Sequence, residues 1–292
     1  MGSYSKVRAQ DATMLRAWTN DGTGLPVVIS NGLGASSAAW PAITAPDSGF
    51  RVVTWHHRGL GGSDRPARPE AIHVEDHAAD LGAVMTAAGM QQALLLGWSL
   101  GVNAAFEFSR IQPNRACGLL AVAGIPGGSL KAMYGPTNMP KGLREPAGQV
   151  SARMLPITGP WLTYLAAAMQ RSQYPAPESN VDAAAQDAVQ PSAVGAMLRE
   201  FAAQDWKWYS RLAIALGEHA EMDVSNTAFP VTFLGGRQDA ITSSDDVRAV
   251  ARSINGARVR ILPAGTHLLP LQYPAFILDE LRKLARRSGL TS

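Results

Sequence analysis

The sequence predicts an α/β fold built on a doubly wound, mostly parallel sheet, and three observations support this prediction. Short apolar runs recur along the chain, each run leads into a glycine-containing loop, and helical patterns lie between most of the runs. Most of these runs are apolar throughout rather than alternating, which is typical of strands that helices cover on both faces. Strands that alternate with helices favour a parallel sheet.

Six apolar runs are the candidate strands of this sheet. They lie at residues 26–32, 51–57, 93–99, 118–124, 230–236 and 257–265. Upstream of them, residues 5–21 alternate weakly between polar and apolar side chains. That weak alternation predicts an antiparallel hairpin at one edge of the sheet.

Four further segments carry apolar residues at helical spacing. They are residues 73–89, 99–111, 243–254 and 273–287. The first of these segments ends at Gly89, a residue type that favours the C-terminal end of a helix. The third opens with serines and acids, as a capped helix N-terminus does.

The interval from Gly124 to Pro230 breaks this rhythm. It holds about 105 residues, whereas an ordinary crossover between strands needs a few tens at most. Residues 161–170 and 192–216 within it have the pattern of helices with an apolar face. These helices either form a cap over one end of the sheet or only enlarge the core.

We expect a cap, and this expectation divides the chain. Residues 1–126 and 227–292 would form the core, and residues 127–226 would form a helical cap inserted between two strands. The insertion follows a strand at its carboxyl end, which is the edge where open α/β sheets bind ligands. Candidate residues for the cap's inner wall are its aromatic side chains, Trp161, Tyr164, Trp206, Trp208 and Tyr209.

Composition excludes several classes of protein. The 26 Lys and Arg residues nearly balance the 23 Asp and Glu residues and are dispersed, so the basic footprint of a nucleic-acid interface is missing. The single cysteine, Cys117, cannot form an internal disulfide or a four-cysteine zinc site. No apolar stretch approaches the ~20 residues of a membrane span, and the N-terminus lacks a signal-peptide core. We therefore expect a cytoplasmic protein; the oligomeric state is not readable from the sequence.

A serine between two glycines stands where a predicted strand meets a predicted helix. The pentapeptide Gly97-Trp98-Ser99-Leu100-Gly101 closes the run at 93–99 and opens the next helix. Glycines tolerate the crowding of so tight a turn, and the turn would project the Ser99 hydroxyl at the top of the sheet. The first amides of the helix, that of Leu100 in particular, would point the same way. The alternative is an ordinary helix N-cap serine flanked by loop glycines.

A serine hydroxyl needs a base and an orienting acid to act as a nucleophile. Asp239 follows the run at 230–236, and His267 follows the run at 257–265. The order Ser99, Asp239, His267 is the one in which α/β hydrolases carry their catalytic residues.

Other residues compete for the two supporting roles. His56 and His57 also follow a strand and are the main rivals as base, whereas His73 and His77 lie at or in a helix and His219 lies in the expected cap. Asp245 and Asp246 are rivals for the acid, although acids are common in a first helical turn because they interact favourably with the helix dipole.

With these residues in view, the chain resembles the α/β-hydrolase-fold superfamily, in its serine esterase and lipase branch. The similarity covers roughly residues 25–128 and 227–285. It includes "VVISNGLGASSAAW", which resembles the family's His-Gly oxyanion segment, and "HHRGLGGSDRP", which resembles its Arg-Gly-x-Gly-x-Ser loop. By this resemblance the Leu33 amide would be a second oxyanion donor beside Leu100.

Two positions depart from the family pattern, and the nucleophile narrows the chemistry. Asn31 stands where the family usually has His, and His56 stands where it often has Asp. Epoxide hydrolases and haloalkane dehalogenases of this fold use Asp at the nucleophile position, so Ser99 argues against both activities. The resemblance implies acyl transfer to water without a metal or organic cofactor.

Three functions follow as hypotheses. The first is hydrolysis of a carboxylic ester with an apolar, small to medium acyl or alcohol group, with the ester and water as the partners. The second is hydrolysis of another acyl bond: a lactone, an amide or peptide, or the carbon–carbon bond of a ring-cleavage product. The third is a non-catalytic module that binds a small ligand.

Overall fold

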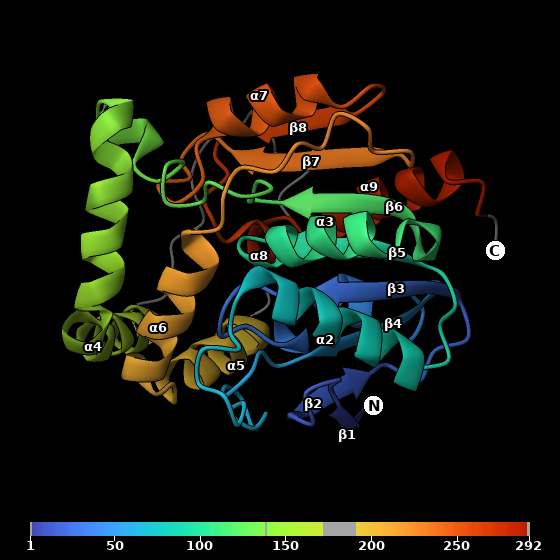
Figure 1. The fold of residues 1–292 in the computed structure, drawn as a ribbon, viewed down its shortest axis with the longest axis horizontal. Coiled ribbons are helices and arrows are strands. Elements are labelled where there is room, and N and C mark those ends of the chain that lie inside the picture. Colours follow the sequence, from blue (N-terminus) through green and yellow to red (C-terminus); the bar gives the residue numbers. More distant parts are fainter. Residues whose placement is uncertain (1, 138, 172–190, 291–292) are drawn as a thin grey trace.

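The computed structural model describes residues 2–137, 139–171 and 191–290, with only the backbone described over 162–171 and for part of 191–198. Its centre is an eight-stranded sheet in the order β1-β2-β4-β3-β5-β6-β7-β8 (Figure 1). The strands are β1 (Ser3–Arg8), β2 (Met14–Thr19), β3 (Leu25–Ser30), β4 (Phe50–Trp55), β5 (Ala93–Trp98), β6 (Ala116–Val122), β7 (Val231–Gly236) and β8 (Arg258–Leu262).

Most of the sheet is parallel, as the apolar runs predicted. The neighbours from β4 through β3 to β8 pair in parallel. Strands β1 and β2 form an antiparallel hairpin that joins the sheet through β4, with Val7 opposite Leu15. This hairpin at the edge and the α/β fold class are both confirmed.

The described helices lie on both faces of the sheet and beyond one of its ends. They are α1 (Pro41–Thr44), α2 (Val74–Ala87), α3 (Gly101–Ile111), α4 (Lys141–Arg171), α5 (Pro191–Ala202), α6 (Trp206–Gly217), α7 (Ser244–Ser253), α8 (Leu269–Gln272) and α9 (Pro274–Arg287). The described residues also form the short 3-10 turns η1 (Ser37–Ala39), η2 (Pro113–Arg115) and η3 (Gly135–Thr137). Helix α2 ends one residue before the C-cap Ala88, and Gly89 follows with φ of +64°.

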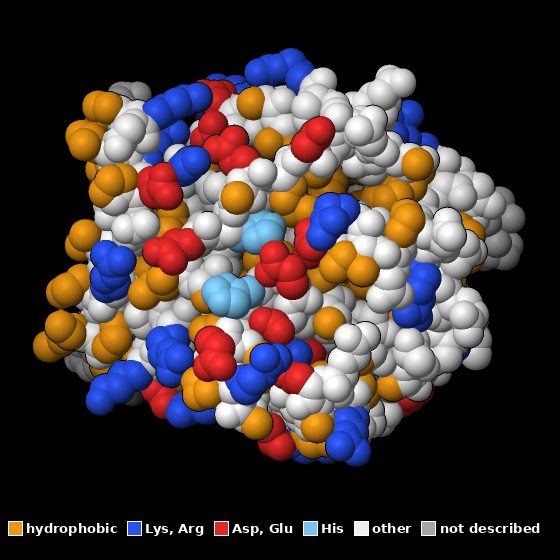
Figure 2. All heavy atoms as spheres, viewed as in Figure 1, with side chains coloured by type: hydrophobic (Ala, Val, Ile, Leu, Met, Phe, Trp, Pro, Cys, Tyr) orange, Lys and Arg blue, Asp and Glu red, His pale blue; other side chains and the backbone are white. Residues whose placement is uncertain are grey.

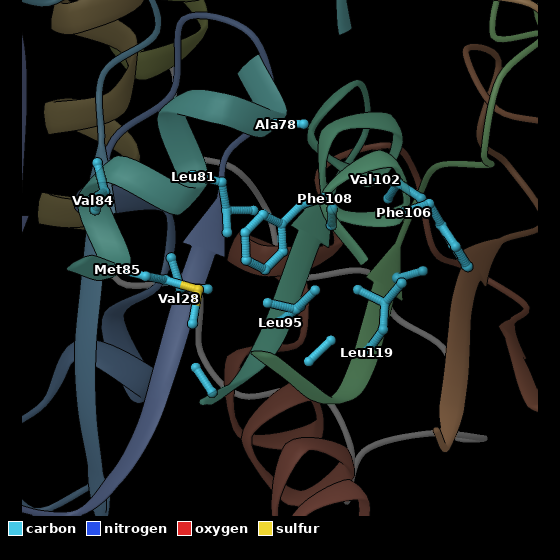
Figure 3. Close-up of a cluster of buried hydrophobic side chains, with 14 of the residues drawn as sticks. Val28, Ala78, Leu81, Val84, Met85, Leu95, Val102, Phe106, Phe108 and Leu119 are labelled. Carbon is cyan, nitrogen blue, oxygen red and sulfur yellow. The ribbon is translucent and has the colours of Figure 1, made fainter. Parts of the chain in front are cut away.

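Each face of the sheet has its own buried apolar cluster. On one face, α2 and α3 pack on strand residues such as Val28, Leu95 and Leu119 (Figure 3). Helix α7 contributes Val247 and Ala251 to the same cluster. On the other face, α1 and α9 pack on the alternate residues of the same strands, such as Ile29 and Leu96. Because successive side chains of a strand point to opposite faces, a strand covered on both sides must be apolar throughout. This requirement explains the unbroken apolar runs.

Helices α4, α5 and α6 occupy the interval between β6 and β7, at the end of the sheet toward which the parallel strands point (Figure 1). Two helical segments were expected there, but the second is broken into α5 and α6. The break occurs because the Asp205 side chain accepts hydrogen bonds from the amides of Lys207 and Trp208 and so caps a new helix. Helix α4 begins earlier than expected and runs through Pro146, Pro156 and Pro160. The division into a core and a cap at residues 127–226 stays a prediction.

Helix α4 differs from the helices that pack on the sheet in having an apolar outer face. Hydrophobic side chains gather at the edge of the molecule that α4 occupies (Figures 1 and 2). Its exposed apolar residues are Leu143, Val150, Met154, Ile157 and Trp161. Across the described helices, none combines the length and apolarity needed to cross a bilayer.

Candidate active site

The turn between β5 and α3 presents Ser99 at the carboxyl edge of the sheet. Ser99 has φ of +54°, in the left-handed region, where a residue with a Cβ atom costs about 1–2 kcal/mol. Its amide donates to the Val122 carbonyl at 2.9 Å, and its carbonyl accepts from the Val102 amide at 3.0 Å. These bonds to β6 and α3 hold the serine in its strained conformation.

The glycines around Ser99 are required by close backbone approaches. A Cβ atom on Gly101 would lie 2.1 Å from the Ser30 carbonyl oxygen, and one on Gly97 would lie 2.8 Å from the Cα of Val102. Both distances are shorter than any normal contact. The Gly-x-Ser-x-Gly pattern therefore reflects how closely β3, β5 and α3 meet at this turn.

The structure brings Ser99, His267 and Asp239 together in a hydrogen-bonded chain. His267 Nε2 lies 2.8 Å from Ser99 Oγ. On the other side of the ring, His267 Nδ1 lies 2.9 Å from Asp239 Oδ2 and 3.1 Å from Oδ1. Because an ionised carboxylate only accepts, Nδ1 carries the proton in the neutral ring and Nε2 is free to accept the serine proton.

Backbone amides fix the orientation of Asp239. Its side chain is fully buried, and Oδ1 accepts from the amides of Ile241 and Thr242 at 2.8 and 2.9 Å. The Thr242 hydroxyl in turn donates to the carbonyl of Ala123. Ala123 follows Val122, whose carbonyl accepts from the Ser99 amide. The carboxylate thus meets His267 in a geometry that the loop after β7 determines.

The rival acids lie elsewhere. Asp245 is exposed and binds Arg248 at 2.9 Å within α7. Asp246 lies 3.5 Å from Arg144 of α4. Both occupy the first turn of α7, and their described polar partners are cations rather than His267.

Leu100 follows Ser99 as the N-cap residue of α3, and Gly32, the residue before Leu33, is so close to Ser99 that a Cβ atom on it would lie 3.5 Å from Ser99 Cβ. Within the described part of the chain, neither the amide of Leu33 nor that of Leu100 donates to a protein acceptor. The side chain of Leu33 packs with Trp208 and Leu212 of α6, and the side chain of Leu100 packs against the same cluster. Helix α6 therefore lies over the residues that were expected to supply the two oxyanion donors.

Asn31, two residues before Leu33, makes hydrogen bonds through its side chain and its backbone carbonyl. Its Nδ2 donates to the Thr54 hydroxyl at 2.8 Å, and its Oδ1 accepts from the Trp40 indole at 2.8 Å. Its backbone carbonyl lies 2.9 Å from His57 Nε2. Asn31, one of the two residues that depart from the family pattern, is thus held by three hydrogen bonds.

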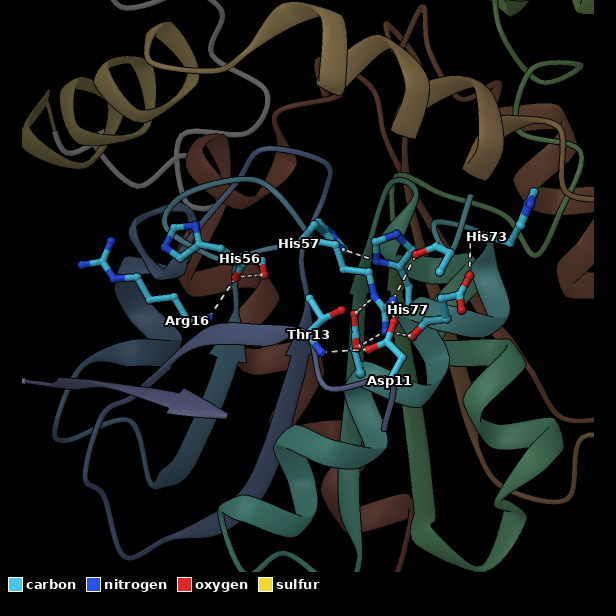
Figure 4. A network of polar contacts seen from close by, with 12 residues as sticks. Asp11, Thr13, Arg16, His56, His57, His73 and His77 are labelled. Carbon is cyan, nitrogen blue, oxygen red and sulfur yellow. Dashed lines mark hydrogen bonds and ion pairs between the residues drawn. The ribbon is translucent and has the colours of Figure 1, made fainter. Parts of the chain in front are cut away.

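The side chains of His56, His57 and His77 are buried (Figure 4). His57 and His77 meet through their Nδ1 atoms at 3.0 Å. Since the Asn31 carbonyl can only accept, His57 donates through Nε2, and His77 donates to Nδ1 of His57. Burial lowers the pKa of both rings, and burial lowers the pKa of His56 to about 4. These rings are therefore neutral at pH 7.

The remaining histidines sit at helix ends. His73 is the N-cap residue of α2. His219 follows α6 and lies 3.9 Å from the Glu75 carboxylate. None of the five other histidines takes the place of His267 beside Ser99.

A buried ion pair anchors the loop that follows β4. Arg58 donates to both carboxylate oxygens of Asp80, at 2.6 and 2.7 Å, and also to Asp11. Burial raises the pKa of Asp80 to about 6 although Arg58 opposes the rise, so the carboxylate is mostly ionised at neutral pH. Nothing in the sequence pattern pointed to Asp80 as the partner of this arginine.

The aromatic residues that were expected to line a cap have different surroundings. Trp206 and Tyr209 pack with Phe201, and the Tyr209 hydroxyl donates to the Leu33 carbonyl at 3.1 Å. The Trp208 indole donates to the Arg58 carbonyl at 2.8 Å. Trp161, by contrast, is 69% exposed. The side chain of Tyr164 lies outside the described residues.

A family model described as the alpha/beta hydrolase fold matches residues 26–274. The chain belongs to this family. In the part that the structure describes, no three His, Cys, Asp or Glu side chains are grouped so as to hold a metal ion.

Relatives of this α/β hydrolase resemble it over different lengths. A protein of Caulobacter segnis, named as the carbamate hydrolase RutD, is 38% identical over 99 residues, which are 34% of this chain and 37% of the relative. The matched region thus spans about a third of that relative.

Solved structures match nearly the whole chain. An esterase from a Rhodococcus species has a TM-score of 0.76 at 20% identity, covering 98% of this chain and 100% of the other. An esterase from Thermogutta terrifontis has a TM-score of 0.72 at 22% identity, covering 98% and 99%. An enol-lactonase from Burkholderia xenovorans has a TM-score of 0.72 at 18% identity, covering 97% and 100%. At these identities the likeness establishes the shared fold.

Proposed function

We propose that this α/β hydrolase cleaves carboxylic esters through an acyl-enzyme, with Ser99 as nucleophile, His267 as general base and Asp239 as the acid that orients the base. One observation carries the proposal. Ser99 Oγ, the His267 ring and the Asp239 carboxylate form a continuous hydrogen-bonded chain at 2.8 and 2.9 Å. The serine stands on a strained strand-to-helix turn, which is the setting in which such a nucleophile operates.

The geometry supports a two-step acyl transfer. Ser99 Oγ attacks the ester carbonyl carbon while His267 Nε2 takes the hydroxyl proton, and the carbonyl oxygen becomes an oxyanion that the amides of Leu33 and Leu100 stabilise. The carbon–oxygen bond to the alcohol then breaks, and His267 returns the proton to the departing oxygen. Water, deprotonated by His267, then attacks the acyl carbon. The bond from this carbon to Ser99 Oγ breaks, His267 returns the proton to Ser99 Oγ, and the carboxylic acid leaves. Asp239 stabilises the imidazolium throughout.

Helix α6 supports a preference for apolar, small to medium substrates. Leu33 and Leu100 share an apolar cluster with Trp208, Leu212 and Leu216 of α6. We propose that the segment 127–226 acts as a cap whose inner wall excludes water from the proposed oxyanion donors. Excluding water would strengthen the electrostatic interaction between these amides and the oxyanion. Each methylene that fits such a wall gains at most ~0.8 kcal/mol.

The same residues could serve another acyl bond, which is the second candidate. Relatives of the chain are named as a carbamate hydrolase and an enol-lactonase, and both names describe hydrolysis at an acyl carbon. A non-catalytic, ligand-binding role is less well supported, since such a role does not require the unbroken hydrogen-bonded chain from Asp239 to Ser99.

A panel of chromogenic esters of increasing acyl length tests the proposal, with a lactone and a carbamate as further arms. The wild type should turn over esters, with kcat/KM rising over the first few carbons and then falling. Ser99→Ala should lose several orders of magnitude in kcat and keep its fold, and the exposed Ser253→Ala serves as the matched control. A phosphonate that labels wild type and Ser99→Ala equally would overturn the assignment of the nucleophile. Turnover of the lactone or carbamate alone would favour the second candidate.

A further inference from the structure

Trp98, the residue before Ser99, is the last residue of β5 and is 5% exposed. Its indole Nε1–H donates to the backbone carbonyl of His267 at 3.0 Å. This bond joins Trp98, the neighbour of Ser99, to the loop that carries His267, 169 residues later in the sequence. The two segments that supply Ser99 and His267 are therefore tied together by a contact outside the chain of proton transfer.

The indole also lies close to Gly32, to the Trp40 ring and to the His267 ring. A Cβ atom on Gly32 would lie 3.1 Å from Trp98 Cε3 and 3.2 Å from Cδ2, so the glycine there makes room for the ring. The Trp40 ring packs at 89° to the Trp98 ring with a centroid distance of 6.1 Å. The His267 ring lies at the same centroid distance from Trp98, 6.1 Å, at an interplanar angle of 35°. Trp98 thus touches both segments that border Ser99.

His267 lies on a loop between β8 and α8 and needs such support. The residue before it is held by Gln272, whose Oε1 accepts from the amide and the hydroxyl of Thr266, both at 2.9 Å. Two residues before His267, the Gly265 carbonyl accepts from the Gln238 amide. The bond from Trp98 adds a third hydrogen-bonded residue to this loop, His267 itself. A site residue on a loop keeps its geometry through supporting hydrogen bonds of this kind.

We infer that Trp98 is a positioning residue for His267: its indole N–H fixes the backbone of the base so that Nε2 meets the Ser99 hydroxyl at hydrogen-bonding distance. This inference rests on the proposed function. Trp98 does not act on the reacting atoms itself, because its N–H is occupied by the His267 carbonyl. Its loss would let the loop move, and a displacement of about 1 Å at the reacting groups can cost ~10²-fold in rate.

Two replacements at position 98 test the inference. Trp98→Phe removes the N–H and part of the ring. Site-specific replacement of Trp98 by 3-benzothienylalanine keeps the shape of the ring and removes only the N–H, so it covers the case in which the phenylalanine variant fails to fold. The control is Trp55→Phe: Trp55 is also buried, and its indole nitrogen has no hydrogen-bond partner within the described part of the chain.

For both replacements at position 98 we expect kcat on the best ester to fall about tenfold or more with KM within about twofold of wild type. Trp55→Phe should keep the wild-type kcat. A proton NMR spectrum provides a reading that needs no substrate: the downfield signal of the Nδ1–H between His267 and Asp239 should broaden or vanish in the position 98 variants and persist in the control.

Three results would overturn the inference: an unchanged kcat in the benzothienylalanine protein, an equal loss in Trp55→Phe, or a rise in KM alone, which would make Trp98 a wall of the substrate site. Failure of the proposed function is a separate outcome. It would appear as a wild type that is inert toward every acyl substrate and toward the phosphonate. The Nδ1–H signal of His267 would still show whether the loss of the Trp98 N–H disturbs the contact between His267 and Asp239.

Discussion

His57 and His77 form a buried pair in which two ring nitrogens lie 3.0 Å apart, and the pair ends on the carbonyl of Asn31. Each ring is neutral in the folded protein because burial lowers its pKa. In the unfolded chain both should titrate near ~6.5. Below that pH the unfolded state therefore binds more protons than the folded state.

Linkage then requires the free energy of unfolding to fall as the pH decreases below about 6.5, by up to ~1.4 kcal/mol per pH unit for each histidine. Urea unfolding at pH 7.5, 6.5 and 5.5 measures this dependence. The double variant His57→Leu/His77→Leu should show a shallower slope than wild type, whereas His73→Asn, at an exposed histidine, should not. Equal slopes in wild type and double variant would mean that the pair is not buried and neutral.

Asn31→Leu should destabilise the fold by about 1–3 kcal/mol. The substitution leaves the buried Trp40 indole N–H without its acceptor, and an unsatisfied buried donor costs its full desolvation penalty. Adding Trp40→Phe removes that donor and should recover part of the loss. Thermal unfolding of the single and double variants checks the expectation; an additive further loss in the double variant would contradict it.

Tyr209→Phe should lower kcat by up to about fivefold, if the whole of a ~1 kcal/mol hydrogen bond is felt in the transition state. The Tyr209 hydroxyl of α6 donates to the carbonyl of Leu33, whose amide is a proposed oxyanion donor. Tyr134→Phe, which loses a hydroxyl contact to Ser151 instead, is the matched control. Steady-state kinetics on one ester measure kcat for both variants. An equal loss of kcat in Tyr134→Phe would show that the hydrogen bond from Tyr209 to Leu33 does not contribute specifically to catalysis.

Ser99→Gly should be more stable than Ser99→Ala by about 0.5–1 kcal/mol. The left-handed φ at position 99 strains any residue with a Cβ atom, whereas glycine adopts it freely and loses only part of that advantage to its greater backbone entropy when unfolded. In the middle of α3, by contrast, alanine should be more stable than glycine, and Ala105→Gly should lower the free energy of unfolding by about 1 kcal/mol. Calorimetric melting of the three variants tests the pair of effects, and a Ser99→Gly protein that melts below Ser99→Ala would refute the strain.

The elements of the core follow from local pattern. The run at 93–99 becomes β5, and the helix expected from residue 99 begins two residues later as α3 because Ser99 and Leu100 form the turn. The insertion was harder to predict. Prolines usually end a helix, yet α4 continues through Pro156 and Pro160, and Gly159 between them lies beneath the Trp206 side chain of α6. Packing of this kind overrides local preference and leaves no periodic signal.

The site was predictable to the extent that it depends on strand ends. Parallel strands share one carboxyl edge, so residues that follow β5, β7 and β8 are expected to converge there, and the structure places Ser99 within hydrogen-bonding reach of His267. The supporting contacts made by Asn31, Trp98 and Tyr209 depend on side-chain directions and on the docking of α6. No spacing in the sequence encodes such contacts, and a lone Asn or Trp carries no motif.

The separation of Ser99 and His267 along the chain has a consequence for the order of folding events. The two residues are 168 positions apart, and His267 follows β8, which is the edge strand of the sheet and pairs with β7. Contacts of such long range form late, because the entropy of closing the intervening loop is lost before they contribute. During refolding from urea, the proposed esterase activity should therefore return after the tryptophan fluorescence of the core, and a chain truncated before β8 should bind no phosphonate.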